Sequence, residues 1–326
     1  MKFLFTADIH LSDSSQDAYR FGLFQWLRQQ QEIYRTDAIM ILGDLTTEKN
    51  KHSAKLVNKI VGGLRLLRPP ILILKGNHDY IREDIPFFKF LNSIKGITFC
   101  TNPTYIEEYN IYMVPHQTTQ AALNAAFLKA PKGCLLTTHA TLTGAIGDTG
   151  SRLTGMAIAP NKARKLYSGD VHVPHVCEGV TYIGSPYHTR HGIDYKARVL
   201  LLDDDKETNL YFDAPKKLSL TIRDLSEMPE LKKGDQVKVT LELPRSEAVE
   251  WANHKKSIID YCKSKGVEVY GTELKVAQTR KRQRLDDTPI NRSNLDYFKA
   301  FCAAEQVPSN VKSVGLQLVE SGGSNG

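Results

Sequence analysis

The stretch "ILILKGNHDY", residues 71–80, joins a short apolar run to a cluster of polar side chains. Four consecutive Ile and Leu residues, stopped by Lys75 and Gly76, are typical of a strand buried on both faces. Segments of helical length and spacing occupy residues 16–34, 46–67 and 118–129. Between and around them lie five more apolar runs that stop at a polar residue or glycine: "KFLFTAD" (2–8), "DAIMILGD" (37–44), "IYMVPH" (111–116), "GCLLTTHA" (133–140) and "VTYIGSP" (180–186). This alternation predicts a layered α/β domain.

Polar side chains follow most of these runs, at the point where each strand is expected to end. The set comprises Asp8, His10, Asp44, Asn77, His78, His139, Asp170 and His172. Open α/β sheets bind their ligands at the carboxyl edge of the strands. We therefore expect these side chains to converge.

The same residues are those that a two-metal centre needs. Two divalent ions roughly 3.5–4 Å apart can clamp the attacking and leaving oxygens of a phosphoryl displacement. Asp44 is the expected bridge between them, because a carboxylate has two oxygens to share. Asp8 and His10 are two residues apart, so their side chains lean to one side of a strand. Asn77 adds a neutral oxygen ligand.

The order of these motifs resembles the calcineurin-like metallophosphoesterase superfamily. Its pattern is DxH, GDxx, GNH[DE], a strand-end histidine and GHxH, and the chain matches every station but one between residues 8 and 172. The resemblance implies an α-β-β-α sandwich. It assigns one metal to Asp8, His10, Asp44 and His172, and the other to Asp44, Asn77, His139 and Asp170. It makes His78 the catalytic residue that orients the scissile phosphate and protonates the leaving oxygen.

The departure from the superfamily pattern is Asp170, which stands in "GDVH" (169–172) where a histidine is expected. A carboxylate can replace imidazole as a ligand, since both present a lone pair at about 2.0–2.2 Å. We expect Asp170 to bind metal and to add one negative charge. A mixed oxygen and imidazole shell of this kind favours manganese, with magnesium as the alternative.

Beyond the metal motifs, the chain resembles the SbcD type of DNA-repair nuclease within this superfamily. The supporting features are "HATLTGAIGDTG" (139–150), "GSPYHTRHG" (184–192), and a later β-α-β pattern in which "DQVKVTLEL" and "VEVYGTELKV" flank a helix expected from Ser246. We expect a catalytic domain at 1–215, a capping and DNA-binding domain at 216–276, and at 277–326 a basic linker, a partner-binding helix at 293–306 and a flexible tail. His188, Arg190 and His191 are the expected substrate contacts.

Partners follow from the same resemblance. The terminal helix presents Leu295, Phe298 and Cys302 on one face, and we expect this face to dock on an SMC-like ATPase of the SbcC type or on a second copy of the chain. The net charge of +7 and pI of about 9.0 favour a polyanion such as DNA. The run "RKRQR", Arg280 to Arg284, is either a DNA contact or a solvated arm.

Composition limits the remaining classes. With 41% hydrophobic residues and no apolar run long enough to span a bilayer, the chain is expected to be a cytoplasmic protein of a bacterial or phage-infected cell. Five cysteines without a CxxC pair argue against a disulfide framework or a cysteine zinc site. We expect a manganese-dependent DNA exonuclease or endonuclease of repair and recombination. The alternatives are a small-molecule or cyclic-nucleotide phosphodiesterase and a catalytically idle binding subunit.

Overall fold

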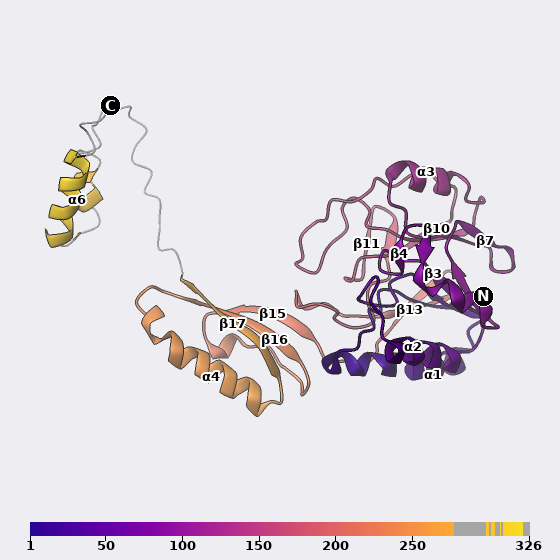
Figure 1. Cartoon of the computed structure of the whole chain (residues 1–326), viewed down its shortest axis with the longest axis horizontal. Helices are drawn as coiled ribbons and strands as arrows, with labels where there is room; N and C mark the ends of the chain where they lie inside the picture. Colours follow the sequence, from indigo (N-terminus) through magenta and orange to yellow (C-terminus); the bar gives the residue numbers. More distant parts are fainter. Residues whose placement is uncertain (277–297, 300, 304–306, 308, 322–326) are drawn as a thin grey trace. The chain divides into compact units, whose positions relative to one another are not determined.

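The computed structural model describes residues 1–276, 298–299, 301–303, 307 and 309–321 (Figure 1). The chain divides into two compact units, Met1–Ala277 and Gln278–Gly326, and each is described here by itself. No helix among the described residues is both long enough and apolar enough to cross a membrane.

The first unit contains two six-stranded sheets. The first sheet runs in the order β14 (Lys206–Leu210), β13 (Val199–Asp203), β1 (Lys2–Thr6), β2 (Ala38–Ile41), β3 (Ile71–Leu74) and β6 (Ile97–Cys100). The second runs in the order β11 (His175–Cys177), β12 (Val180–Tyr182), β10 (Lys165–Gly169), β9 (Leu135–His139), β8 (Ile111–Val114) and β7 (Thr104–Ile106). Strands β1, β2, β3 and β6 are parallel, as are β8, β9, β10 and β12. The carboxyl ends of each parallel set therefore share one edge.

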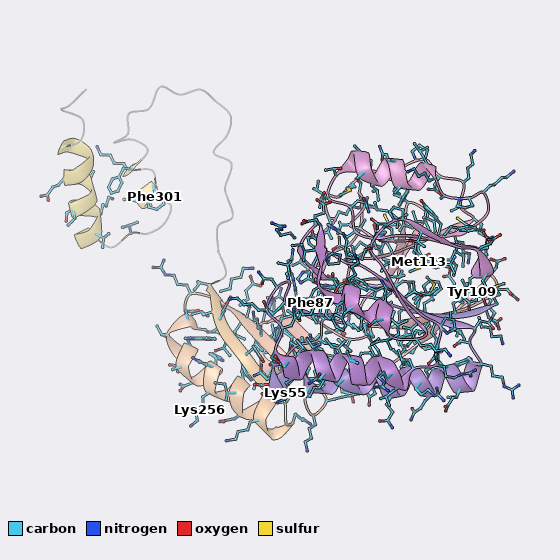
Figure 2. All side chains as sticks on the ribbon, turned by 45° about the vertical axis from the view of Figure 1, so that its right-hand side comes forward. Lys55, Phe87, Tyr109, Met113, Lys256 and Phe301 are labelled. Atoms are coloured by element: carbon cyan, nitrogen blue, oxygen red, sulfur yellow. The ribbon has the colours of Figure 1, made fainter. Side chains whose placement is uncertain are left out.

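Alternation along the strands builds the layers. Phe3, Met40, Leu72 and Met113 belong to the core between the sheets, where Figure 2 labels Met113. Neighbouring strand residues turn to the outer faces, which are covered by α1 (Gly22–Tyr34) and α2 (Ala54–Leu66) on one side and by α3 (Gln120–Leu128) on the other. Figure 1 shows these helices on opposite sides of the sheets. The expected α-β-β-α sandwich is confirmed.

The helices begin later than the sequence pattern suggested. Helix α2 begins after Ser53, whose Oγ accepts the Leu56 N–H at 3.0 Å, rather than near Thr46. Thr119 caps α3 in the same way. A 3-10 segment, Ser15–Phe21, precedes α1. Because Thr46 donates to the Glu48 carbonyl at 2.9 Å, residues 46–52 form a loop, and this loop reaches the site described below.

A three-stranded parallel sheet follows the two large ones. It consists of β15 (Lys217–Ile222), β16 (Gln236–Leu243) and β17 (Glu268–Val276). Helix α4 (Trp251–Ser264) connects β16 to β17, so the predicted β-α-β pattern is present, but its helix begins five residues after Ser246. Val237, Val239, Ile258 and Cys262 lie in a hydrophobic cluster of their own. We call β15, β16, β17 and α4 the small domain.

The second unit is described only in part. Helix α6 spans Ser309–Ser321, and residues 298–299 and 301–303 are helical. Much of the helix expected at 293–306 lies outside the described residues, including Leu295, as does the run Arg280 to Arg284. A Cβ placed on Gly315 would lie 2.3 Å from the Phe298 ring, so Phe298 packs against α6. The ring of Phe298 therefore makes a contact within the second unit, while the docking of this face on another protein stays a prediction.

Candidate metal centre

The expected site residues lie at the carboxyl ends of parallel strands in both sheets. Asp8 and His10 follow β1, Asp44 follows β2, and Asn77 and His78 follow β3. His139 ends β9, while Asp170 and His172 follow β10. A cavity of about 280 Å³ opens between these ends, lined by His10, Asp44, Asn77, His78, Gly147, Asp148, Leu153, Asp170, Val171, His172 and Arg190.

Four of these residues have left-handed backbones. The φ angles of Asp8, His10, Asp44 and Asp170 are 51°, 41°, 56° and 74°. Such a conformation costs of order 1–3 kcal/mol for a residue other than glycine, and it turns the chain sharply at the strand end. Gly76 is needed at the same edge, since a Cβ there would lie 2.2 Å from Asp44 Oδ1.

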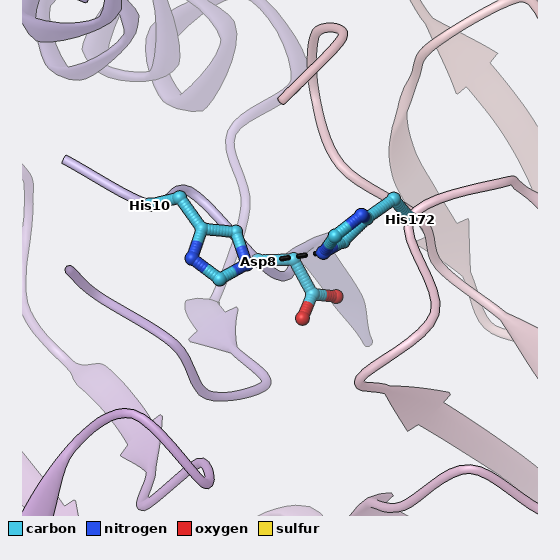
Figure 3. A group of neighbouring side chains, drawn as sticks. All are labelled: Asp8, His10 and His172. Atoms are coloured by element: carbon cyan, nitrogen blue, oxygen red, sulfur yellow. Dashed lines mark hydrogen bonds between the residues drawn. The ribbon is translucent and has the colours of Figure 1, made fainter. Parts of the chain in front are cut away.

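One group of donors consists of Asp8, His10 and His172, shown in Figure 3. The Nε2 atoms of the two histidines are 3.1 Å apart, closer than two charged imidazoles would tolerate. Asp8 Oδ2 is buried without a hydrogen-bond partner. Its Oδ1 accepts the Asp170 N–H at 3.1 Å.

Asp44 joins this group to a second one. Its Oδ2 lies 3.6 Å from His10 Nε2, and its Oδ1 lies 3.3 Å from His139 Nε2. His139 Nε2 is in turn 3.6 Å from Asp170 Oδ1. Asn77 Nδ2 donates to the same Asp170 oxygen at 3.2 Å, while Asn77 Oδ1 is buried without a partner. Asp44 therefore occupies the position between two clusters of oxygen and nitrogen donors.

Neighbouring groups fix the orientation of two of the three candidate ligand histidines, His139 and His172. His139 Nδ1 lies 2.6 Å from the Leu42 carbonyl, which accepts its proton, so Nε2 is the nitrogen available to bind a metal. His172 Nδ1 lies 2.9 Å from Asp148 Oδ2, with the same consequence for its Nε2. Asp148 was not among the expected site residues. It stands in a Gly-rich loop whose sequence has no periodic signal, and only the fold brings it to His172.

Asp79 organises the backbone of the site rather than a histidine ring. Its carboxylate accepts the N–H groups of Asp44, Leu45 and Gly76 at 2.7–2.9 Å. These bonds join the turn after β2 to the turn after β3. They hold Asp44 opposite Asn77 and His78.

Asp170 is held by one of its two oxygens. Oδ2 accepts from both the N–H and the hydroxyl of Thr141, each at 2.7 Å. Oδ1 faces His139 and Asn77. The carboxylate is thus oriented with one oxygen toward the remaining donors.

His78 is one of the residues that line the cavity. Its Nδ1 lies 2.5 Å from the Thr47 carbonyl, which belongs to the loop before α2. Its Nε2 lies 4.0 Å from Asp44 Oδ2. Burial lowers the pKa of His78.

Burial and mutual interaction shift the pKa values of the carboxyl groups and imidazoles in the site. Burial raises the pKa of Asp8 to about 6 and raises that of Asp44 well above its usual value. Burial alone would lower the pKa of His139, but the carboxylates of Asp44, Asp170 and Asp8 raise it to about 9. Cations between these groups would satisfy Asp8 Oδ2, Asn77 Oδ1 and His139 Nε2, which are buried without a hydrogen-bond partner. The donor set therefore fits divalent metals.

The three expected substrate contacts have different surroundings. Arg190 lines the cavity. His191 lies against the ring of Tyr270 in the small domain, with 4.7 Å between ring centroids. His188 is buried outside the cavity lining, where its ring nitrogens face main-chain groups of Lys217 and Tyr195.

Comparison with known proteins gives a family match and weaker likenesses. The family model described as calcineurin-like phosphoesterase matches residues 1–174. The SbcD components of the SbcCD nucleases of Escherichia coli K12 and O157:H7 are each 28% identical over 102 residues, which cover 28% of this chain and 26% of the relative. The match thus spans about a quarter of these curated relatives. A solved archaeal phosphodiesterase is 15% identical, with a TM-score of 0.36, over 64% of this chain and 100% of that one.

Proposed function

Since the chain belongs to the calcineurin-like phosphoesterase family and is therefore a metal-dependent phosphoesterase, we propose that it hydrolyses phosphodiester bonds of DNA. The expectation of a metal-dependent hydrolase of phosphate esters is confirmed at the level of the family, and cleavage of a diester belongs to the proposal. The observation that carries the proposal is the position of Asp44, whose two oxygens face His10 and His139 in separate donor groups. Such an arrangement suits a pair of cations with one shared carboxylate.

The residues that would hold the cations follow from the two groups. Asp8, His10, Asp44 and His172 would hold one, and Asp44, Asn77, His139 and Asp170 the other. When bound, the cations supply neutralisation of charge on the phosphate and a lower pKa for the attacking water. Because this set combines carboxylate and amide oxygens with imidazole nitrogens and contains no thiolate, we propose manganese as the resident metal.

His78 is the proposed catalytic residue. Its Nδ1 is occupied by the Thr47 carbonyl, so its Nε2 is the atom that meets the substrate. Protonated there, the ring donates to the leaving oxygen and holds the phosphate in line. Arg190, on the cavity wall, is the proposed second contact to the phosphate.

DNA as the substrate is supported by the charge of the chain and by the SbcD relatives. The net charge of +7 suits a polyanion. The relatives are named as components of a nuclease. We extend the proposal to a role in DNA repair with a separate ATPase partner, to DNA binding by the small domain, and to a cytoplasmic location.

The test is hydrolysis by the purified full chain with manganese on three substrates: linear duplex DNA, single-stranded DNA and a chromogenic phosphodiester. Cleavage of DNA supports the proposal. Cleavage of the chromogenic ester alone would favour a small-molecule phosphodiesterase. If manganese binds and no substrate is cut, the chain is a binding protein without catalytic activity. Protein with Asp44→Asn, purified in parallel, controls for contaminating nucleases.

A further inference from the structure

We propose that strand β15 of the small domain positions His10 and His172, and that it thereby sets the affinity of one of the two metal positions. The inference rests on the proposed metal-binding role of these histidines. Two chains of contacts lead from the first residues of β15, one to the main chain of His10 and the other to the ring of His172, and both run through residues outside the metal motifs.

The first chain of contacts is ionic. Lys217, the first residue of β15, donates from Nζ to Asp17 Oδ1 at 2.7 Å. The same oxygen lies 3.0 Å from Arg20 Nη2. Arg20 Nη1 then donates to the His10 carbonyl at 2.5 Å. The side chains of Lys217, Asp17 and Arg20 are only 10%, 13% and 2% exposed, so solvent screens these charges weakly.

Arg20 is held in place from several sides. Its guanidinium lies over the ring of Tyr187, 5.3 Å from the centroid. The hydroxyl of Tyr187 donates to the carbonyl of Ile9, the residue before His10. A rigid Arg20 can therefore fix the left-handed turn at His10, whose φ is 41°.

The second chain of contacts is made by backbone. Ser219 in β15 donates its N–H to the Gly192 carbonyl at 2.9 Å. Ile193, the next residue, donates its N–H to the Asp148 carbonyl at 2.9 Å. The Asp148 side chain then accepts from His172 Nδ1 at 2.9 Å. The approach is close, since a Cβ on Gly192 would lie 2.3 Å from the Asp148 carbonyl oxygen.

The two chains of contacts meet near the metal position. Arg20 Nη2 donates to the Thr189 carbonyl at 3.3 Å, and Thr189 Oγ1 lies 3.1 Å from His172 Nδ1. The two histidines themselves are 3.1 Å apart at Nε2 (Figure 3).

The second metal position has other supports. His139 is oriented by the Leu42 carbonyl, and Asp170 is oriented by Thr141. Both of these partners lie in the two large sheets or their loops. Among the described residues, the small domain therefore supports one metal position and not the other.

The test is manganese titration of the full chain by calorimetry. In the variant Lys217→Met, the ammonium is lost while the apolar stem remains, and Asp17 keeps its pairing with Arg20. We expect one of two binding events to weaken by about tenfold, the low end of the effect of removing groups that support metal ligands. Asp148→Asn should weaken the same event. Lys217→Arg should restore it, because a guanidinium can also reach Asp17.

Variants that lack one metal position show which of the two binding events Lys217 affects. In His139→Ala protein, which keeps the half with His10 and His172, Lys217→Met should still weaken binding. In His172→Ala protein it should have no further effect. Lys216→Met is the control, since Lys216 forms an ion pair with Asp194 at the surface. Equal weakening of both events, or none, would overturn the inference.

A second measurement uses reciprocity, because metal binding must affect β15 as strongly as β15 affects metal binding. Manganese should slow hydrogen exchange of the Ser219 amide in the wild-type chain, and this slowing should shrink in Lys217→Met. If the wild-type chain binds no manganese, the proposed function fails. If it binds two ions and Lys217→Met binds both with unchanged affinity, the coupling alone is wrong.

Discussion

Asp170 stands where the superfamily pattern has a histidine, and its surroundings hold one oxygen on Thr141 and leave the other facing His139. The carboxylate has a polar partner for each oxygen, and burial opposed by His139 and Thr141 leaves its pKa below the usual value. It is therefore ionised at neutral pH. An ionised ligand makes the site more negative than an imidazole would.

This charge has a consequence for the pH profile of hydrolysis. A more negative ligand set polarises a water less, so the wild-type enzyme should work best at alkaline pH. Asp170→His should retain activity with its pH profile moved downward, because a neutral ligand replaces an anionic one. Asp170→Ala should lose most activity. Hydrolysis rates of the two variants, measured across neutral and alkaline pH, check these predictions. If Asp170→Ala is as active as wild type, Asp170 does not bind a metal that the reaction needs.

His78 supplies a second prediction at this scale. Removal of its ring in His78→Ala should leave two manganese ions per chain and lower turnover by about 10² to 10⁴, the usual effect of losing a general acid. Metal content by elemental analysis and single-turnover rates are the measurements. Because His78 also lies near His10 and Asp44 in a group able to hold a metal, loss of an ion from the variant would reassign it as a ligand.

Among the elements, sequence predicted most of the strands whose buried residues follow one another, although it missed β13 with its four buried apolar residues. It also predicted the alternating strand β16 and the half-exposed strand β17. Strands β1, β2, β3, β8 and β9 fall inside the predicted runs, because each carries four or five buried residues in succession. Strand β10 was missed, since Lys165 and Ser168 interrupt its apolar character. The exposed strand β14 was missed for the same reason, as its burial comes only from Thr208 and Leu210.

The site residues also fall into those that sequence could predict and those that it could not. The motif residues could be predicted because each lies near the end of a strand, at a place that the apolar run before it marks in the sequence. Asp148 and Arg20 could not, because their roles depend on partners that the local pattern does not reveal, His172 and the His10 carbonyl. These pairings join residues that are distant in the sequence, so they cannot be predicted from the sequence around either residue.

Helix α2 gives a prediction at this scale. Ser53 is exposed and its Oγ satisfies the Leu56 N–H, so Ser53→Ala should lower the free energy of unfolding by about 1 kcal/mol. Urea denaturation measures the difference. The exposed neighbour Lys51 provides the control, and Lys51→Ala should unfold like wild type. An equal loss in both variants would mean that α2 does not begin at Ser53.

For the whole molecule, the division after Ala277 separates the proposed catalytic machinery from the second unit. All the proposed metal ligands lie between Asp8 and His172. A chain ending at Ala277 should therefore keep manganese-dependent hydrolysis of a small phosphodiester at close to the full-length rate, because it retains every proposed metal ligand and His78.

The same truncation tests the proposed partner. It should abolish association with an ATPase of the proposed kind, measured by co-purification of the two proteins. Retained association would place the contact before Ala277. Loss of the cooperative unfolding transition in the truncated chain would instead show that the second unit contributes to the core.

The position of β1 in its sheet also bears on how the protein is made. One of its edges pairs with β13, Lys2 lying opposite Asp203. A ribosome adding about 5–20 residues per second needs roughly 10 to 40 seconds to make the intervening chain. Until then one edge of the first strand has no partner, and an open edge invites pairing with other chains. Asp8 and His10 are thus synthesised well before β13, the strand that closes this edge of their sheet, and the edge beside them is complete only after residue 203 has left the ribosome.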